Sequence, residues 1–373
     1  MKILYVFTYG YSLESWDYSG FIQKELKYFQ KLNDELNCEF TLLTYGDNSD
    51  LNIIDKEKYP YINVVPIYSI TKIRQNSFLN YLFSLYVPFY IKKHTGDFDL
   101  IKQNQLLGSW VSILLKWVNR KPLFIRTGYD MLQFSIAEKK SILKRFLYKI
   151  LTYFSLRFSD IYTVSSNSDL EYLKKKFSFA NEKIHKISNW TENEIRKTYE
   201  NRTSNKVLCV GRLEKQKNFE HIINQFSNSE LEIDIVGTGT LMKELEYLAN
   251  EKNTKVNFLG QKSYEELIDI YNNYKFYLSA SFYEGNPKTI LEAMGCGCLV
   301  IVSNLKNNKE IVSNKTGILF EFDDNLEQIF KNITKHELEY KKIAENGNFQ
   351  ILQTNSLNVI VKKEIDLINL LNS

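Results

Sequence analysis

The stretch Lys206-Val-Leu-Cys-Val210-Gly211-Arg212-Leu-Glu-Lys-Gln-Lys217-Asn218 begins as a short apolar strand and turns at a glycine. Two cations, Arg212 and Lys217, follow it in a loop or helix start. Arginine offers a planar fork of donors and lysine a point charge, and together they suit a diphosphate. An ordinary glycine turn with exposed basic side chains is the alternative interpretation.

The same order of strand, turn and helical stretch recurs on both sides of this segment. Further strands of the second half are predicted at 231–236, 256–259, 276–279 and 299–302. Strands of the first half are predicted at 2–8, 40–44, 63–67, 98–101, 122–126 and 160–164. Short apolar runs that alternate with helical stretches predict parallel, doubly wound sheets. We therefore expect an α/β fold in which two doubly wound, Rossmann-like domains face a central cleft lined by strand carboxyl ends.

The chain length of 373 residues suits two domains of roughly 150–200 residues each. We place an N-terminal domain at 1–190, a polar hinge at 191–205 and a C-terminal domain at 206–355. A closing helix is predicted at 356–373, where apolar residues recur at helical spacing.

Composition argues against several classes of protein. The four cysteines have neither disulfide-framework nor zinc-pair spacing. No uncharged apolar run reaches the ~18 residues of a membrane-spanning helix, and the start of the chain does not resemble a signal peptide. Residues 1–190 hold 26 Lys/Arg against 18 Asp/Glu, which gives +8 within a total net charge of +4. We therefore expect a cytoplasmic protein. Since no nucleic-acid recognition motif accompanies the basic charge of the N-terminal half, we expect its anionic partner to be something other than nucleic acid.

Two carboxylates surround a predicted helix start in Glu284-Gly-Asn-Pro-Lys-Thr-Ile-Leu-Glu292. Asn286 is predicted as the N-cap and Pro287 as the first helical residue. Free amides at a helix start bind anions, and a nearby carboxylate can accept two hydrogen bonds from a diol such as ribose. The alternative is a capped amphipathic helix with Glu292 in a solvated salt bridge.

A third turn, Gly237-Thr238-Gly239, follows the strand predicted at 231–236. It lacks the third glycine of a dinucleotide fingerprint, so it is a weak indication of a nicotinamide cofactor. A tight turn that approaches a ligand and an ordinary strand-to-helix turn remain equal alternatives.

Taken in this order, the motifs from about Lys206 to Phe322 resemble glycosyltransferase family 4. The resemblance also includes Phe258-Leu-Gly260, Ser279-Ala-Ser-Phe-Tyr-Glu284, Ala293-Met-Gly-Cys-Gly297, Glu310-Ile-Val312 and Thr316-Gly-Ile-Leu319. It implies the two-domain GT-B architecture and the transfer of a sugar from a nucleotide donor with retention of anomeric configuration.

The resemblance implies roles for individual residues. Arg212 and Lys217 would neutralise the donor diphosphate in place of a metal ion and, with Glu284, form the catalytic group. Glu292 would hold the ribose hydroxyls. The implied donor-binding residues are Gly20, Gly211, Gly237, Gly239, Gly285, Asn286, Pro287, Lys288, Thr289 and Glu292. The nucleotide sugar is a substrate and not a cofactor. No metal ion is expected, since Arg212 and Lys217 would take its place at the diphosphate.

The N-terminal half resembles the family more loosely. Gly20 lies where a glycine-rich loop approaches the donor phosphate. Tyr129 and Asp130 follow the strand at 122–126, where many relatives have a histidine, and we interpret them as acceptor-side contacts.

Residues 139–157 combine six Lys or Arg and no acid with apolar residues at helical spacing. A basic amphipathic helix of this kind binds an anionic membrane surface, here the inner face of the cytoplasmic membrane. A core helix with a basic outer edge is the alternative.

We expect a retaining glycosyltransferase that moves a hexosyl or N-acetylhexosaminyl group from a UDP- or GDP-linked donor to a saccharide or lipid-linked acceptor. Its pathway would be synthesis of a bacterial surface glycan such as capsule or lipopolysaccharide. The rival interpretations are a non-hydrolysing sugar-nucleotide epimerase and a non-catalytic partner subunit of the same fold. The joint presence of Arg212, Lys217, Glu284 and Glu292 argues against an inactive site.

Overall fold

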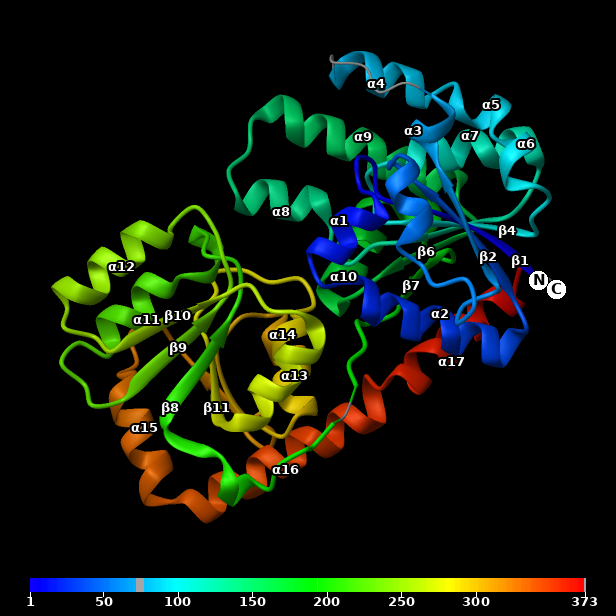
Figure 1. Cartoon of the computed structure of the whole chain (residues 1–373). Helices are drawn as coiled ribbons and strands as arrows, with labels where there is room; N and C mark the ends of the chain where they lie inside the picture. Colours follow the sequence, from blue (N-terminus) through cyan, green and yellow to red (C-terminus); the bar gives the residue numbers. More distant parts are fainter. Residues whose placement is uncertain (72–76, 193, 372–373) are drawn as a thin grey trace. The chain divides into compact units, whose positions relative to one another are not determined.

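The computed structural model describes residues 1–71, 77–192 and 194–371 (Figure 1). The chain divides into two compact units, one formed by Met1–Ser188 with the segment from Val361 and the other by Asn189–Ile360. Position 193 of the predicted hinge and positions 372–373 of the predicted closing helix lie outside the described residues.

The first unit is built on one parallel sheet. Within the described residues its strand order is β3-β2-β1-β4-β5-β6-β7, and every adjacent pair is parallel. The strands are β1 Lys2–Val6, β2 Glu39–Thr44, β3 Ile62–Pro66, β4 Leu100–Asn104, β5 Leu123–Arg126, β6 Ile161–Val164 and β7 Ile184–Lys186. The order reverses between β1 and β4, so this is the doubly wound topology predicted from the sequence.

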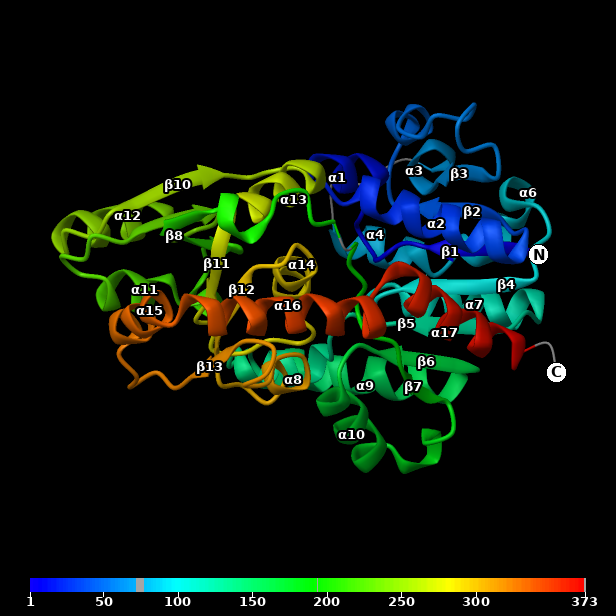
Figure 2. The same ribbon diagram turned by 90° about the horizontal axis from the view of Figure 1, so that it is seen from below.

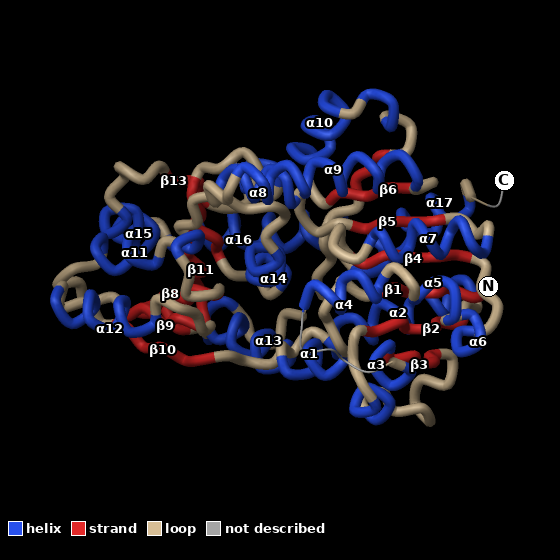
Figure 3. Tube along the Cα trace, turned by 90° about the horizontal axis from the view of Figure 1, so that it is seen from above, coloured by secondary structure: helices blue, strands red, loops and turns tan. Residues whose placement is uncertain are grey.

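Helices cover both faces of this sheet. Their bounds are α1 Leu13–Tyr18, α2 Ile22–Leu36, α3 Ile67–Ile70, α4 Ser77–Ser84, α5 Val87–Tyr90, α6 Lys92–Thr95, α7 Ser109–Asn119, α8 Met131–Ala137, α9 Ile142–Phe158, α10 Asn167–Lys176 and α17 Leu357–Asn369. Figure 2 shows α2 and α17 over one face, and Figure 3 shows α7 and α9 over the other.

Neighbouring side chains of β4 show how the two faces are held. The Lys102 ammonium donates to the carboxylate of Glu364 on α17 and to the hydroxyl of Tyr28 on α2. Gln103 points the other way and accepts a hydrogen bond from Ser112 of α7, with 2.5 Å between Oγ and Oε1. Successive side chains of a strand point to opposite faces of the sheet, so Lys102 and Gln103 are buried on different faces, each with its own hydrogen-bond partners.

The second unit repeats the architecture. Within the described residues its parallel sheet has the order β10-β9-β8-β11-β12-β13, which reverses between β8 and β11. The strands are β8 Thr203–Val210, β9 Glu232–Val236, β10 Val256–Gly260, β11 Tyr274–Ser279, β12 Leu299–Ser303 and β13 Ile318–Phe320. Because β8 begins at Thr203, the last residues of the predicted hinge belong to a strand.

Two apolar layers enclose this second sheet. The helices are α11 Phe219–Gln225, α12 Met242–Glu251, α13 Tyr264–Asn273, α14 Lys288–Gly295, α15 Leu326–Lys335 and α16 Glu337–Thr354. Val207 and Cys209 pack toward α11, α12 and α15, whereas Leu208 and Val210 pack toward α13 and α14. This period of two identifies a strand buried on both faces, as the apolar run at 206–210 predicted. Among the described residues, no helix combines the length and apolarity needed to cross a bilayer.

Candidate functional site

The loops after β8 and β11 leave neighbouring strands at the carboxyl edge of the second sheet. Lys217 lies in the first loop, and its Nζ donates to Oε1 of Glu284 in the second at 2.5 Å. The two side chains are 15% and 7% exposed. The loops are also joined through Gln216, whose carbonyl accepts from the Phe282 amide and whose Nε2 donates to the Tyr283 carbonyl, both at 2.9 Å. Two predicted catalytic residues, 67 positions apart, therefore form one nearly buried ion pair.

Three predicted glycines lie where the chain packs closely around Lys217, and two of them, Gly237 and Gly239, allow the loops after β8 and β9 to approach each other. A Cβ on Gly211 would lie 3.1 Å from the Lys217 stem. Gly237 has φ +143°, and a Cβ there would lie 2.0 Å from the Gly211 carbonyl oxygen. A Cβ on Gly239 would lie 2.4 Å from the Leu213 carbonyl oxygen. Close backbone packing therefore requires Gly237 and Gly239, whereas Gly211 leaves room for the Lys217 stem.

Arg212 follows Gly211 and has an exposed side chain. Among the described residues, its guanidinium forms neither a hydrogen bond nor an ion pair, so the structure does not join it to Lys217 and Glu284. The pKa of nearby Glu214 is lowered, mainly by hydrogen bonds from the amide and hydroxyl of Thr240 and to a smaller extent by the charge of Arg212. The guanidinium therefore remains available to a ligand at the edge of the sheet.

The start of α14 differs by one residue from the prediction. The helix begins at Lys288 with Pro287 as the N-cap, so the prediction of Asn286 as N-cap and Pro287 as first helical residue is wrong. The Asn286 side chain is engaged elsewhere, because its Oδ1 accepts from the Asn189 amide at 2.9 Å. Asn189 Nδ2 also donates to the Asn286 carbonyl at 2.8 Å. Asn189 thus fixes the loop that leads into the helix.

Two more side chains hold this loop and were not singled out from the sequence. Asn307 Nδ2 donates to the carbonyls of Glu284 and Gly285 at 2.6 and 2.7 Å. Thr289 lies in the first turn of α14, and the Tyr277 hydroxyl fixes its side chain by donating to Oγ1 at 2.8 Å. Such contacts depend on tertiary structure, and a lone Asn or Tyr gives no local signal of them.

Glu292 lies in the second turn of α14 and is 6% exposed. Its Oε2 accepts from the Tyr271 hydroxyl at 3.4 Å. Burial raises the pKa of Tyr271, and the Glu292 charge adds to that rise. The alternative of a solvated salt bridge at Glu292 is therefore wrong, and the carboxylate is held in a protected position.

In the first unit, Gly20 lies at the end of α1 rather than in the loop after β1. Its φ is +71°, and its amide donates to the Asp17 carbonyl at 2.9 Å. Gly10, with φ +82°, occupies the loop after β1 instead. Gly108 lies close to that loop, because a Cβ there would be 3.1 Å from the Tyr9 amide. Gly10 and Gly108 therefore lie at the reversal of strand order between β1 and β4, whereas Gly20 is explained by a helix end.

Tyr129 and Asp130 follow β5 and have different surroundings. Tyr129 is 38% exposed, with its ring centroid 4.6 Å from that of Phe134. Asp130 is 2% exposed and caps α8, since its Oδ1 accepts from the Gln133 amide at 2.7 Å. Burial raises the pKa of Asp130 to about 7, and the charge of Asp169 adds to the rise.

The raised pKa of Asp130 predicts a dependence of stability on pH. Its folded pKa lies above the unfolded value, so its contribution is complete below about pH 4 and is lost as the pH rises to about 7. Asp130→Asn keeps a capping side chain and cannot ionise. We expect this variant to be more stable than the wild type at pH 8 by on the order of 3–4 kcal/mol and similar to it at pH 4. Urea denaturation at both pH values measures the difference, and an equal stability gap at both would contradict the assignment.

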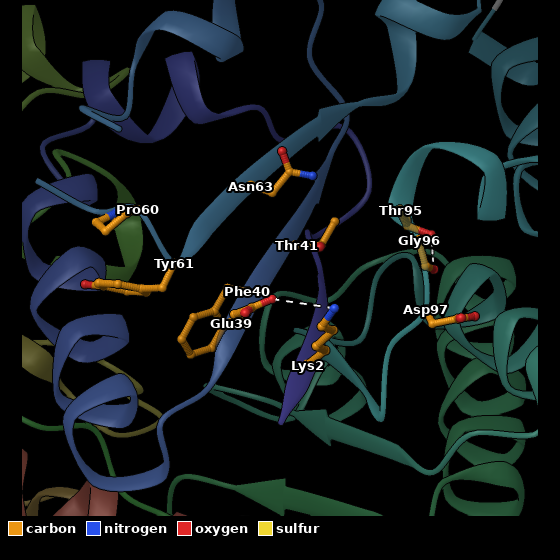
Figure 4. A pocket seen from close by; sticks show the side chains of 10 residues that line it. All are labelled: Lys2, Glu39, Phe40, Thr41, Pro60, Tyr61, Asn63, Thr95, Gly96 and Asp97. Atoms are coloured by element: carbon orange, nitrogen blue, oxygen red, sulfur yellow. Dashed lines mark hydrogen bonds and ion pairs between the residues drawn. The ribbon is translucent and has the colours of Figure 1, made fainter. Parts of the chain in front are cut away.

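The described residues also form a pocket of about 230 Å³ at the amino edge of the first sheet (Figure 4). Its lining includes Lys2, Glu39, Tyr61 and Asp97, near the amino ends of β1 and β2. Asp97-Phe98-Asp99 has the Asp-x-Asp spacing of metal-binding triplets, but Asp99 Oδ2 accepts from the Lys2 amide at 2.8 Å. Ligands of doubly wound sheets bind at the carboxyl edge, so this pocket is separate from the candidate site.

Comparison with known proteins agrees with the geometry of the second unit. Residues 191–348 match the family model of the glycosyl transferases group 1. An uncharacterised glycosyltransferase of Methanocaldococcus jannaschii is 24% identical over 84% of this chain and 81% of its own length. The Escherichia coli UDP-Gal:alpha-D-GlcNAc-diphosphoundecaprenol alpha-1,3-galactosyltransferase is 26% identical over 77% of this chain and 79% of its own. The sucrose-phosphate synthase of Thermosynechococcus elongatus superposes with a TM-score of 0.78 at 19% identity, over 100% of this chain and 99% of its own.

Proposed function

We propose that the chain is a retaining glycosyltransferase with its donor site at the carboxyl edge of the second sheet, on the premise that residues 191–348, which match the glycosyl transferases group 1, act as a domain of that group. The overall fold is GT-B, with two doubly wound units. The donor is a UDP- or GDP-linked hexose or N-acetylhexosamine. The acceptor is a saccharide or lipid-linked saccharide, and the product is part of a bacterial surface glycan.

The observation that supports this proposal most strongly is the ion pair between Lys217 and Glu284. It lies where the order of the strands reverses, which is the place where doubly wound sheets bind ligands. Without a ligand, each charge compensates the other in a nearly buried position. When the donor binds, the ammonium has two further hydrogens for phosphate oxygens, and the carboxylate can accept from sugar hydroxyls.

The reaction breaks the bond between C1 of the sugar and the diphosphate oxygen and forms a bond from C1 to an acceptor hydroxyl. Negative charge grows on an oxygen of the departing diphosphate, which takes up the proton that the acceptor hydroxyl loses. Arg212, which is exposed, and Lys217 stabilise the growing charge, and the first amides of α14 add a positive dipole end. Two protein cations supply this stabilisation, so we propose that turnover requires no metal ion.

Glu292 holds the ribose of the nucleotide. Its carboxylate is fixed by α14 and lies beside the buried Tyr271 hydroxyl, so little freedom remains to be lost on binding. The Escherichia coli relative has a diphosphoundecaprenol acceptor in its name, which supports a lipid-linked acceptor for this chain as well.

Proton NMR of nucleotide-sugar turnover tests the reaction class. The chain is incubated with UDP-glucose, UDP-galactose, UDP-GlcNAc, UDP-GalNAc and GDP-mannose in the presence of a chelator. We expect one donor to be hydrolysed slowly in the absence of acceptor, with the α-configured sugar released first. Accumulation of the epimeric sugar would favour the epimerase, and release of the β-configured sugar would contradict retention. Nucleotide binding without turnover of any donor, even with isolated bacterial lipid added as acceptor, would favour a non-catalytic subunit.

A further inference from the structure

Helix α9 turns Thr152, Ser155 and Leu156 inward. Thr152 and Ser155 are fully buried, and Ser155 Oγ donates to Ser109 Oγ of α7 at 2.8 Å. The inward face therefore lets α9 lie close to α7, against which it packs. The alternative of a core helix with a basic outer edge does not fit, because most of the large apolar residues of α9 are exposed and Leu156 is the large apolar residue buried with Thr152 and Ser155.

The outward half of α9 is apolar over most of its length. Ile142, Leu143, Phe146 and Leu147 are 83%, 68%, 56% and 54% exposed, and Ile150, Tyr153 and Phe154 continue the stripe. We call these seven residues the α9 face. A contiguous exposed apolar surface of this kind marks an interaction site in a folded protein.

Aromatic rings extend the α9 face onto neighbouring elements. The exposed Trp117 of α7 contacts Phe158 with ring centroids 5.4 Å apart, and Phe158 stacks with Phe154 at 6.1 Å. On the other side, Tyr153 contacts the exposed Phe179 at 5.2 Å. Rings with a polar tip, such as Trp and Tyr, are typical of the boundary between lipid and water.

Basic residues predominate in the segment that carries the α9 face, where Lys140 pairs with the flanking Glu138 and the other cations lie on or next to the helix. Residues 139–159 contain six Lys or Arg and no Asp or Glu. With about 3.6 residues per turn, the exposed Lys144 and Lys149 project on opposite borders of the apolar stripe. From these borders their stems can lie along apolar surface while the ammonium groups reach lipid phosphates.

We propose that the α9 face docks on an anionic lipid bilayer. The charge pattern favours a bilayer over a second copy of the chain, because a two-fold contact through this face would bring the basic borders of both copies together. Within the first unit, α8 begins after β5 and packs against α9, so docking holds the carboxyl edge of that sheet near the lipid (Figure 1). The role of this placement in presenting a lipid-linked acceptor rests on the proposed function, whereas the docking itself does not.

Vesicle flotation with the full-length protein tests the docking. Vesicles of phosphatidylcholine alone are compared with vesicles that also contain phosphatidylglycerol, at low and high salt. We expect binding to the anionic vesicles, weakened by salt. Leu143→Ser with Phe146→Ser should lower partitioning more than tenfold. Lys144→Glu with Lys149→Glu should lower it at least about fivefold for each cation lost.

Matched controls separate docking from general effects of charge or apolar surface. Tyr247→Ser with Leu338→Ser removes exposed apolar residues of the second unit, and Lys243→Glu with Lys335→Glu changes the net charge equally. Both control variants should bind vesicles like the wild type.

Three results would each overturn the proposal: an equal loss of binding in the control variants, no binding to anionic vesicles at low salt, or a stable dimer that Leu143→Ser with Phe146→Ser dissociates. Nucleotide binding is measured separately, so a failed flotation alongside intact nucleotide binding rejects the docking alone.

Discussion

Replacing Arg212 by alanine is expected to lower kcat/KM for the donor by about 10²–10³-fold, the usual scale for losing a charged contact that strengthens in the transition state. The guanidinium is exposed and, among the described residues, has no ion-pair partner, so the substitution leaves no buried charge behind. The folded protein should therefore keep its stability while it loses transition-state stabilisation. Initial rates of donor turnover, with kcat and KM determined separately, measure the effect.

Two further variants sharpen the Arg212 test. Arg212→Lys keeps the charge but loses the planar fork, so we expect it to recover part of the lost rate. Lys215→Ala removes another exposed cation of the same loop and should leave turnover nearly unchanged. A rate for Arg212→Ala within about threefold of the wild type, or an equal loss in Lys215→Ala, would place the diphosphate elsewhere.

The largest effect on stability is expected from Glu364→Ala in α17. Its carboxylate accepts from Lys102 and from Tyr28, and all three side chains are at most 1% exposed. Burial lowers the pKa of Lys102, and the Glu364 charge counteracts that shift. Removal of the carboxylate leaves an ammonium buried among aromatic rings, with Nζ 4.6 Å from the Tyr28 ring centroid. We expect a loss of about 3–5 kcal/mol in the free energy of unfolding of the first unit.

Urea denaturation followed by circular dichroism measures this loss. Lys102→Met with Glu364→Leu removes both charges together and should recover most of the stability, because no unpaired ion remains. A change below about 1 kcal/mol for Glu364→Ala would show that α17 is held by its apolar contacts alone.

The strands that could be predicted are those whose residues are apolar on both faces. The run at 206–210 coincides with the buried part of β8, since nothing polar interrupts it. The strand predicted at 98–101 is displaced from β4, because Lys102, Gln103 and Asn104 do not resemble strand residues. They are buried only because α17, α7 and the neighbouring loops supply their partners. β7 and β13 were missed as strands, since three residues are too few to show a period.

The candidate site was predictable as a set of motifs but not as a geometry. Spacing along the chain gives no reason for Lys217 to meet Glu284. The pair forms because β8 and β11 are neighbours where the strand order reverses. The amphipathic pattern of 139–157 likewise predicted a helix, which begins at Ile142 because Ser141 caps it, and the pattern did not decide which side faces the core. The small buried residues Thr152 and Ser155 decide it, through packing against α7.

Nucleotide binding by the wild type and Glu292→Ala tests the central claim most directly. Thermal unfolding is followed with UDP, GDP, ADP, CMP and their sugar derivatives in the absence of metal, because a ligand that binds the native state raises its unfolding temperature. The donor site placed at the carboxyl edge of the second sheet predicts an increase with one nucleotide family that Glu292→Ala abolishes. An increase that is equal in Glu292→Ala, or none with any nucleotide, would contradict it.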